Sequence, residues 1–242
     1  MKNLLVPPTN RVSQPAEASL YIYGPIGPYD DYDEVSAKSV AKAIGEVNSA
    51  KTLNIYLNSV GGSVFEGVAI YQELRRFKGK KIIHIDAIAA SIASIIAMAG
   101  DEICMGYNAQ MMIHDPEGMA WGREADLRAY ADILKGTKET LVDTYVARTK
   151  LPRATISAWM SAETWMNADT CMKHGFCDRK VSGNEDVEMD DRSKVILAKF
   201  KHAPKDVVQS RESVVRAMVA SAQMRVLKDK IKSGGQSANS SK

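Results

Sequence analysis

The chain has 242 residues, 45% of them hydrophobic and 25% charged, which is the balance of a soluble globular protein with room for one domain and an appendage. Its net charge of +3 is too small to indicate a nucleic-acid partner, and no apolar run reaches the roughly 20 residues that span a membrane. The segment after Met1 lacks the hydrophobic core of a signal peptide. The three cysteines form no Cys-x-x-Cys pair, so we expect no disulfides, no zinc site and a reducing, cytoplasmic location.

The middle of the chain alternates between strand-like and helix-like segments. Short apolar runs predict strands at 20–23, 54–58, 80–85, 101–105 and 110–113, with a last strand that begins at 176–178. Apolar residues at helical spacing predict helices at 33–48, 63–77, 91–100, 122–149 and 155–160, with another that ends at Gly175. This alternation predicts an α/β domain with a largely parallel sheet and right-handed crossovers.

Two of the predicted helices carry additional signals. Ser63 is followed three residues later by Glu66, which is the pattern of a capping box at a helix start. The helix at 122–149 is longer than a crossover needs, and we expect it to project from the domain and to pack against a partner. Its predicted buried stripe consists of Leu127, Tyr130, Ile133, Leu134, Leu141, Tyr145 and Val146.

Both ends of the chain differ in composition from the middle. Residues 1–17 are rich in Pro, Asn, Ser and Thr, and we expect a flexible or partner-bound arm. Residues 18–183 form the predicted main domain. Residues 184–242 are expected to be a charged, partly helical tail, with a helical pattern at 205–231 and a disordered, low-complexity end.

The segment 87–100 is almost wholly small and apolar, and it carries two hydroxyl groups, on Ser91 and Ser94. We interpret it as the first turns of a buried helix that follows the strand at 80–85. A serine at such a junction lies beside free backbone N–H groups and is shielded from water, so it is a candidate nucleophile. On this segment alone, two small packing residues of a core helix are the favoured alternative.

Two further features are compatible with nucleophilic catalysis. His114 follows an apolar strand and precedes a turn, at the sheet edge where α/β proteins bind ligands, although a solvated loop histidine fits equally well. The pair Gly61-Gly62 lets the backbone approach a ligand closely, and an N–H there together with that of Ile92 could form an oxyanion hole. An ordinary strand-to-helix turn is the alternative. Spacing alone does not establish a catalytic triad, which is defined by geometry.

Several motifs nevertheless occur together in one order, at 55–62, 89–91, 112–116, 163–168 and 174–178. With these motifs, residues 20–181 resemble the proteolytic-subunit family of the Clp proteases, which are serine peptidases. The resemblance is greatest to the phage and prophage branch, the head-maturation (prohead) proteases. It implies a spiral of β-β-α units, as in the Clp and crotonase folds, with the helix at 122–149 as a protruding handle and residues 18–183 as the catalytic domain.

The resemblance also implies a role for individual residues. Ser91 matches the nucleophile and His114 the general base, while Gly62 and Ile92 match the donors of the oxyanion-hole N–H groups. No metal or cofactor is implied. The family usually has an aspartate two residues before the aromatic residue of its last motif, and Glu163 stands at that position here.

Glu163 is therefore the expected third member of the triad, since glutamate also orients imidazole in some hydrolases. Asp115 and Asp169 are the weaker alternatives.

The implied function is that of a serine endopeptidase acting on polypeptides, for the phage branch capsid, scaffold or portal proteins. The expected assembly is a homo-oligomeric ring, heptameric in the family, without nucleic-acid or membrane partners. The arm at 1–17 and the tail after 183 differ from those of housekeeping subunits, which favours an enzyme that acts without an ATPase. The alternatives are a housekeeping Clp subunit that works with an ATP-dependent AAA+ unfoldase, and a non-catalytic or crotonase-like ring protein.

Overall fold

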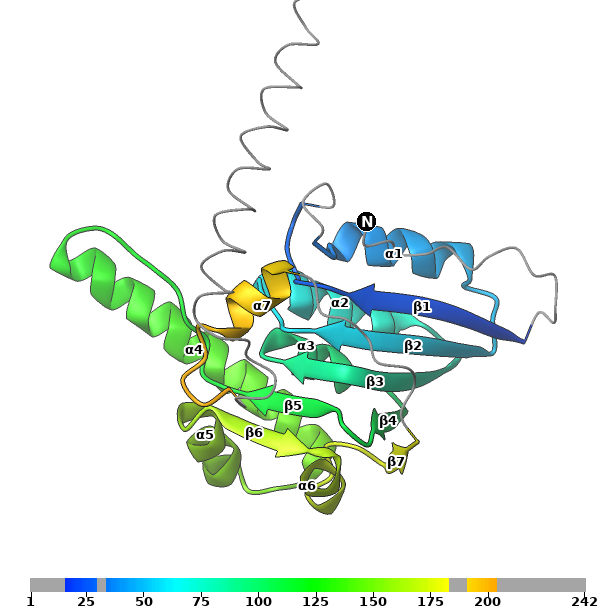
Figure 1. The fold of residues 1–242 in the computed structure, drawn as a ribbon. Coiled ribbons are helices and arrows are strands. Elements are labelled where there is room, and N and C mark those ends of the chain that lie inside the picture. The colour runs from blue at the N-terminus through cyan, green and yellow to red at the C-terminus, as the bar shows by residue number, and fades with distance from the viewer. Residues whose placement is uncertain (1–15, 30–33, 183–190, 204–242) are drawn as a thin grey trace, which may run out of the picture. The chain divides into compact units, whose positions relative to one another are not determined.

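The computed structural model describes residues 16–29, 34–182 and 191–203 (Figure 1). The chain divides into two units, Met1–Val187 and Glu188–Lys242. Within the described residues, no helix combines the length and the apolar character that crossing a membrane requires. The predicted helical pattern at 205–231 and the predicted disordered end lie outside the described residues, as does most of the arm at 1–17. The three-part domain division therefore stays a prediction.

The first unit is built on a seven-stranded, mostly parallel sheet in the order β1-β2-β3-β4-β7, with β5 beside β3 and β6 beside β5. Among the strands of the described residues, only the pair β5–β6 is antiparallel. The strands are β1 (Glu17–Tyr23), β2 (Thr52–Ser59), β3 (Lys80–Ala90), β4 (Glu102–Gly106), β5 (Gln110–Ile113), β6 (Thr164–Asn167) and β7 (Arg179–Val181). The predicted α/β fold is confirmed. Strand β6 was not predicted from the sequence, which indicated only a helix ending at Gly175 in this part of the chain.

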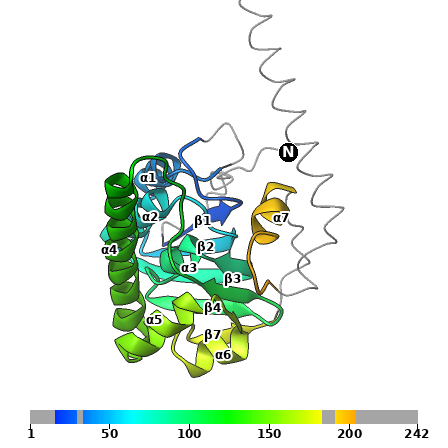
Figure 2. The same cartoon turned by 90° about the vertical axis from the view of Figure 1, so that its left-hand side faces the viewer.

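Helices connect the strands of this sheet, and α1 and α2 lie on one of its faces (Figures 1 and 2). They are α1 (Ala37–Glu46), α2 (Val64–Arg76), α3 (Ile92–Ala97), α4 (Glu124–Thr149), α5 (Arg153–Ser161) and α6 (Ala168–Lys173). The second unit contributes α7 (Asp191–Leu197), which lies before the predicted helical pattern at 205–231.

Alternation along the strands places the core on the helical face of the sheet. In β2, Leu53, Ile55 and Leu57 are fully buried, whereas Asn54 and Tyr56 between them are partly exposed. Each such aliphatic side chain contributes about 1.5–3 kcal/mol of stability through the removal of apolar surface from water. This buried face holds β2 in place, and with it the glycine turn that follows.

The start of α2 follows the predicted cap only in part. The Ser63 hydroxyl accepts a hydrogen bond from the Glu66 N–H at 3.5 Å, as expected of an N-cap. The Glu66 carboxylate does not return the bond to Ser63, whose N–H donates to the Ile26 carbonyl at 2.9 Å. It accepts instead from the N–H of Ala37 at 2.8 Å. Glu66 thus caps the neighbouring helix α1 and links the two helices.

Strand β3 is longer than predicted, and the helix after it is shorter. Residues 87–90 were expected to begin a helix, but they end β3 because they pair with β5 in the register Ile88↔Gln110 to Ala90↔Met112. The first half of β3 pairs with β4 instead. A bulge separates the halves: β2 advances from Leu57 to Ser59 while their partners on β3 are Ile85 and Ala89. Strand β3 therefore pairs first with β4 and then with β5.

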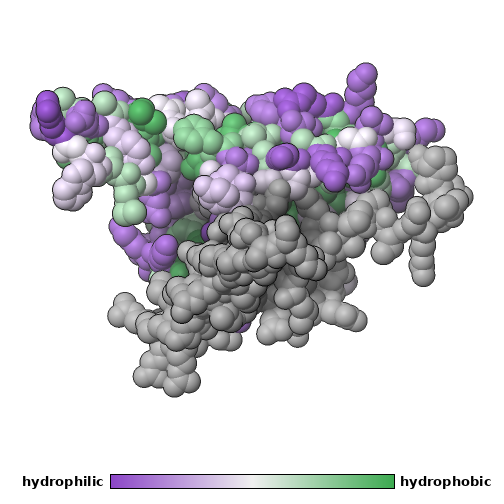
Figure 3. Space-filling view, turned by 90° about the horizontal axis from the view of Figure 1, so that it is seen from above, coloured by the Kyte–Doolittle hydropathy of each residue, from purple (hydrophilic) through white to green (hydrophobic). Residues whose placement is uncertain are grey.

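Helix α4 is buried only over its second half. Leu141 and Tyr145 lie in the core, as the predicted stripe requires, and Val142, which the stripe did not include, is buried as well. Leu127 and Ile133 were predicted to be buried, but they are 45% and 56% exposed, since the first half of α4 extends beyond the sheet (Figure 1). The surface at this end carries apolar residues among hydrophilic ones (Figure 3). The prediction that this helix projects from the domain is confirmed.

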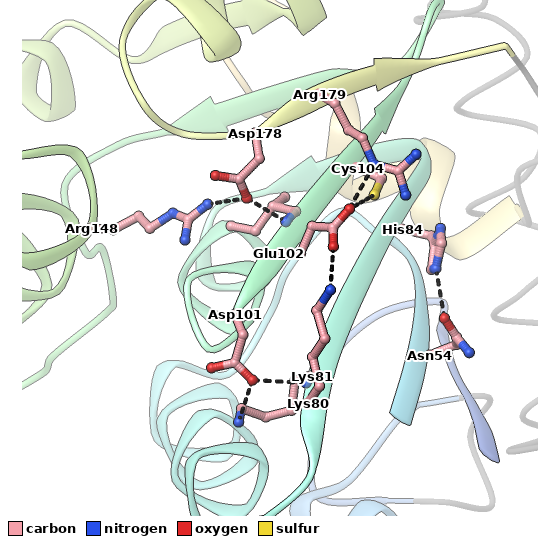
Figure 4. Close-up of polar contacts among 11 residues, drawn as sticks. Asn54, Lys80, Lys81, His84, Asp101, Glu102, Cys104, Arg148, Asp178 and Arg179 are labelled. Atoms are coloured by element: carbon pink, nitrogen blue, oxygen red, sulfur yellow. Dashed lines mark hydrogen bonds and ion pairs between the residues drawn. The ribbon is translucent and has the colours of Figure 1, made fainter. Parts of the chain in front are cut away.

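One ion pair joins the second half of α4 to the sheet, and two more join neighbouring strands (Figure 4). The Asp178 carboxylate accepts from the Ile103 N–H of β4 at 2.7 Å and pairs with Arg148 of α4. Glu102 joins neighbouring strands through ion pairs with Lys80 and Arg179, each at 2.7 Å. Because Arg148 lies about one turn after Tyr145, its ion pair with Asp178 also helps to hold the buried face of α4 in place.

Candidate active site

Ser91 stands between β3 and α3 with φ 54° and ψ −128°, a conformation that non-glycine residues rarely adopt. Such a backbone costs on the order of 1–3 kcal/mol, and it persists where surrounding contacts hold it, often at functional sites. Here the Ser91 N–H donates to the Met112 carbonyl of β5 at 2.9 Å. The side-chain Oγ lies 2.8 Å from Nε2 of His114, which is hydrogen-bond distance.

The sheet explains why these two residues meet although 23 positions separate them in the sequence. Strands β3 and β5 are parallel, and their last pair is Ala90↔Met112. Their carboxyl ends therefore reach the same edge of the sheet. Ser91 follows one end directly and His114 follows the other, so the structure brings both predicted residues together at the edge where α/β proteins place their ligands.

The surroundings of His114 favour the neutral form of its imidazole. Burial lowers the pKa of His114 below its usual value of 6.5, while the negative charges of Glu117, Glu163 and Asp115 raise it by less. A neutral imidazole with Nε2 unprotonated can accept the Ser91 proton, which is what a general base must do. The sequence interpretation had not included Glu117 in this environment.

Strand β6, which the sequence did not predict, brings Glu163 to the same end of the sheet as His114. Strand β6 runs antiparallel to β5 and ends the ladder at the pair Ile113↔Thr164. The next positions on the two strands are His114 and Glu163, so the register places them opposite each other. Glu163 itself has a positive φ of 51°, and its Oε1 accepts from Nε1 of Trp165 at 3.3 Å.

The two alternative acids are engaged elsewhere. The Asp115 carboxylate forms an ion pair with Lys138 at 2.9 Å and accepts from the Ser161 hydroxyl at 3.0 Å. Asp169 lies in α6 and pairs with Lys180 at 2.6 Å. Among the three candidates, the geometry favours Glu163 as the acid that acts on His114.

The turn at Gly61 and Gly62 packs directly against Ser91. A Cβ atom on Gly61 would lie 2.7 Å from both the Ala90 carbonyl oxygen and the Ser91 Cβ, and 3.1 Å from the Ile92 nitrogen. Both glycines have positive φ angles, 89° and 145°, which side chains rarely allow. Only glycine therefore permits this approach.

The two backbone N–H groups predicted as oxyanion donors come from different elements, the glycine turn and the start of α3. The Ile26 N–H donates to the Gly61 carbonyl at 2.8 Å, and the Ile26 carbonyl accepts from the Ser63 N–H at 2.9 Å. These two bonds with Ile26 do not use the N–H of Gly62. Ile92 is the first residue of α3, and the first N–H groups of a helix have no partner within it. These are the two donors predicted for an oxyanion hole.

One pair of residues near the site was not anticipated. Ser94, interpreted from the sequence as a packing residue, is fully buried, but its hydroxyl bonds to the Ser91 carbonyl and to the Tyr145 hydroxyl. Nothing in the sequence marks this pair except that Ser94 is the second hydroxyl of an apolar helix.

Other reactive groups in the described residues offer no second site. The cysteines Cys104, Cys171 and Cys177 are reduced and buried, and burial raises the pKa of the Cys177 thiol to about 11. Within the same residues, no cluster of His, Cys, Asp and Glu has the arrangement of a metal site.

Known proteins match a large part of this chain. A family model described as Clp protease matches residues 20–184, a range that includes Ser91, His114 and Glu163. The chain is also similar to the "ATP-dependent Clp protease proteolytic subunit" of Deinococcus radiodurans. The two are 29% identical over 137 residues, which is 55% of this chain and 67% of that protein.

Proposed function

Because the chain belongs to the Clp protease family, whose members are peptidases, we propose that it is a serine endopeptidase with Ser91 as its nucleophile. The observation that carries this proposal is the 2.8 Å contact between Ser91 Oγ and His114 Nε2. It is made by a strained residue at the end of a parallel strand, beside a glycine turn that no side chain could occupy.

In the proposed reaction, Ser91 Oγ attacks the carbonyl carbon of the peptide bond while His114 Nε2 takes its proton. The carbonyl oxygen becomes negatively charged, and the N–H groups of Gly62 and Ile92 bind it. The C–N bond then breaks, and the proton passes from His114 to the departing amine. Water hydrolyses the acyl-enzyme by the same steps. Glu163 stabilises the imidazolium and orients the ring. The reaction uses no metal or cofactor.

A fluorophosphonate probe tests the nucleophile directly, because its phosphorus reacts with an activated serine hydroxyl. We expect a single adduct on wild-type protein, located on Ser91 by peptide mass spectrometry. Ser94 should stay unlabelled although it lies in the same helix-start segment. An adduct on another serine, or no adduct on protein that cleaves peptides, would overturn the assignment.

The pH dependence of cleavage follows from the lowered pKa of His114. The base works only when neutral, so kcat/KM should be lost as pH falls through a midpoint below 6.5. The negative charge of Glu117 raises this pKa, so Glu117→Gln should move the midpoint to still lower pH. The measurement is kcat/KM for a fluorogenic peptide from about pH 4 to about pH 8. A wild-type midpoint above 6.5, or a shift to higher pH in the variant, would contradict it.

We further propose that the chain forms homo-oligomeric rings around polypeptide substrates. The resemblance to the family implies that each ring is a heptamer. The exposed apolar residues of the projecting segment support packing against another copy, because large contiguous apolar surface is uncommon on monomers. They are Met119, Trp121, Leu127 and Ile133.

The biological role has two candidates. Head maturation in a phage or prophage is supported by the motif resemblance and by the composition of segments 1–17 and 184–242. An ATP-dependent housekeeping role is favoured by the similarity to the Deinococcus radiodurans protein, whose name includes that dependence. Degradation of unstructured casein without any ATPase would support the first role. Degradation that requires an added unfoldase and ATP would support the second.

A further inference from the structure

Ser94 and Tyr145 form a buried hydrogen-bonded chain that ends on the backbone of Ser91. Ser94 donates to the Ser91 carbonyl oxygen twice, through its hydroxyl at 2.6 Å and through its N–H at 3.0 Å. The hydroxyl of Tyr145, on α4, lies 2.7 Å from Ser94 Oγ. Ser94 is fully buried and Tyr145 is 2% exposed, so neither bond competes with bulk water.

The direction of the chain follows from counting protons. A serine hydroxyl has one proton, and the Ser91 carbonyl can only accept, so the proton of Ser94 points at that carbonyl. The hydroxyl of Tyr145 must then donate to Ser94 Oγ. Burial raises the pKa of Tyr145 far above its usual value, so this donor keeps its proton at every physiological pH. Tyr145 therefore polarises Ser94, and Ser94 holds the Ser91 carbonyl.

The held carbonyl belongs to the same peptide unit as the N–H of Ile92. A peptide unit is planar and trans, so its C=O and N–H point in opposite directions. This unit turns about φ of Ile92 together with ψ of Ser91, and the latter torsion belongs to the strained pair φ 54° and ψ −128°. Rotation of that torsion would relieve strain, and it would turn the N–H of Ile92 away from the substrate. Two donors on the carbonyl oppose the rotation.

We propose that Ser94 and Tyr145 are positioning residues that keep the Ile92 N–H aimed at the oxyanion. This inference rests on the proposed function, because an oxyanion donor has meaning only for acyl transfer. Tyr145, in the buried part of α4, would then influence catalysis through Ser94, although it does not touch the substrate. Arg148, one turn further along α4, fixes that helix to Asp178 and thereby keeps Tyr145 in place.

The test compares Ser94→Ala, Tyr145→Phe and the double variant with wild-type protein on a fluorogenic peptide. Loss of one oxyanion donor lowers kcat by roughly 10²–10³-fold, so a donor that is present but loosely held should cost about 10- to 100-fold. KM should change by less than about threefold, because the ground-state carbonyl makes weaker use of this N–H. Affinity for a peptide aldehyde, which forms a tetrahedral adduct, should fall by the same factor as kcat/KM.

Two further readouts separate positioning from a general loss of structure. The acid midpoint of kcat/KM should stay at the wild-type value, since the variants leave His114 and its neighbours intact. The double variant should be no slower than Ser94→Ala alone, because Tyr145 acts only through Ser94. The matched control is Tyr71→Phe, which removes a hydroxyl from a partly buried tyrosine packed against the core on α2 and should leave kcat unchanged.

The inference fails if folded Tyr145→Phe and Ser94→Ala cleave at the wild-type rate, if their losses multiply in the double variant, or if Tyr71→Phe loses as much. These outcomes are distinct from failure of the proposed function, which would show as a wild-type chain without peptidase activity or as a Ser91→Ala variant that retains it.

Discussion

The Ser91→Ala variant is expected to cleave peptides at least about 10⁴-fold more slowly than wild-type protein. The substitution removes the Oγ that lies 2.8 Å from His114 Nε2, and the backbone offers no other atom there to attack a carbonyl. It adds no bulk, so the fold should be unchanged. Initial rates on a fluorogenic peptide and on casein measure the effect, and thermal unfolding confirms that the variant is folded.

The control for this variant is Ser39→Ala, which removes a hydroxyl that bonds within the first turn of α1. It should keep wild-type activity. Members of a catalytic unit are not additive, so Ser91→Ala combined with His114→Ala should be no slower than Ser91→Ala alone. A Ser91→Ala variant within tenfold of the wild-type rate would remove Ser91 from the mechanism.

The Glu163→Gln variant is expected to lower kcat by about 10²- to 10⁴-fold. The exchange keeps the shape of the side chain but removes the negative charge that favours the imidazolium form of His114. An amide can also donate a hydrogen bond, which favours the wrong tautomer of the ring. Because the Glu163 charge raises the pKa of His114, the acid midpoint should in addition move to lower pH.

Asp115→Asn makes the same exchange on the residue next to His114 and is the matched control. Its carboxylate is held by Lys138 and Ser161, so kcat should stay within about threefold of wild type. The charge of Asp115 also raises the pKa of His114, but by less than that of Glu163, so a smaller shift of the midpoint in the same direction is expected. A larger kcat loss in Asp115→Asn than in Glu163→Gln would reverse the assignment of the acid.

Strong periodic signals made much of the fold predictable from the sequence. Strand β5 has the predicted limits, 110–113, because four mostly apolar residues stand between a turn and a histidine. The alanine-rich end of β3 was misjudged because small residues fit a buried strand and a buried helix equally well. Pairing with β5, a contact between segments 22 positions apart, decided between them.

The candidate site shows the same limit of local reasoning. Neither Ser91 nor His114 carries a local sign of its partner, since the contact follows from two parallel strands ending at one edge. The motif resemblance selected Glu163, but its placement depends on β6, a four-residue strand with no amphipathic repeat long enough to detect. The hydrogen bond between Ser94 and Tyr145 could not be predicted, because the two residues lie 51 positions apart.

The bulge in β3 makes the length of the chain before the nucleophile critical. Between the pairs Leu57↔Ile85 and Ser59↔Ala89, β3 contains two residues more than β2. Successive side chains of a strand point to opposite faces, so deleting one of residues 86–88 would turn Ala89 and all later positions to the other face, whereas deleting two would restore them. A substitution in this segment leaves the number of residues, and so the alternation of the strand, unchanged. An insertion or deletion in this segment is therefore expected to preserve the orientation of Ser91 only when it changes the length by an even number of residues.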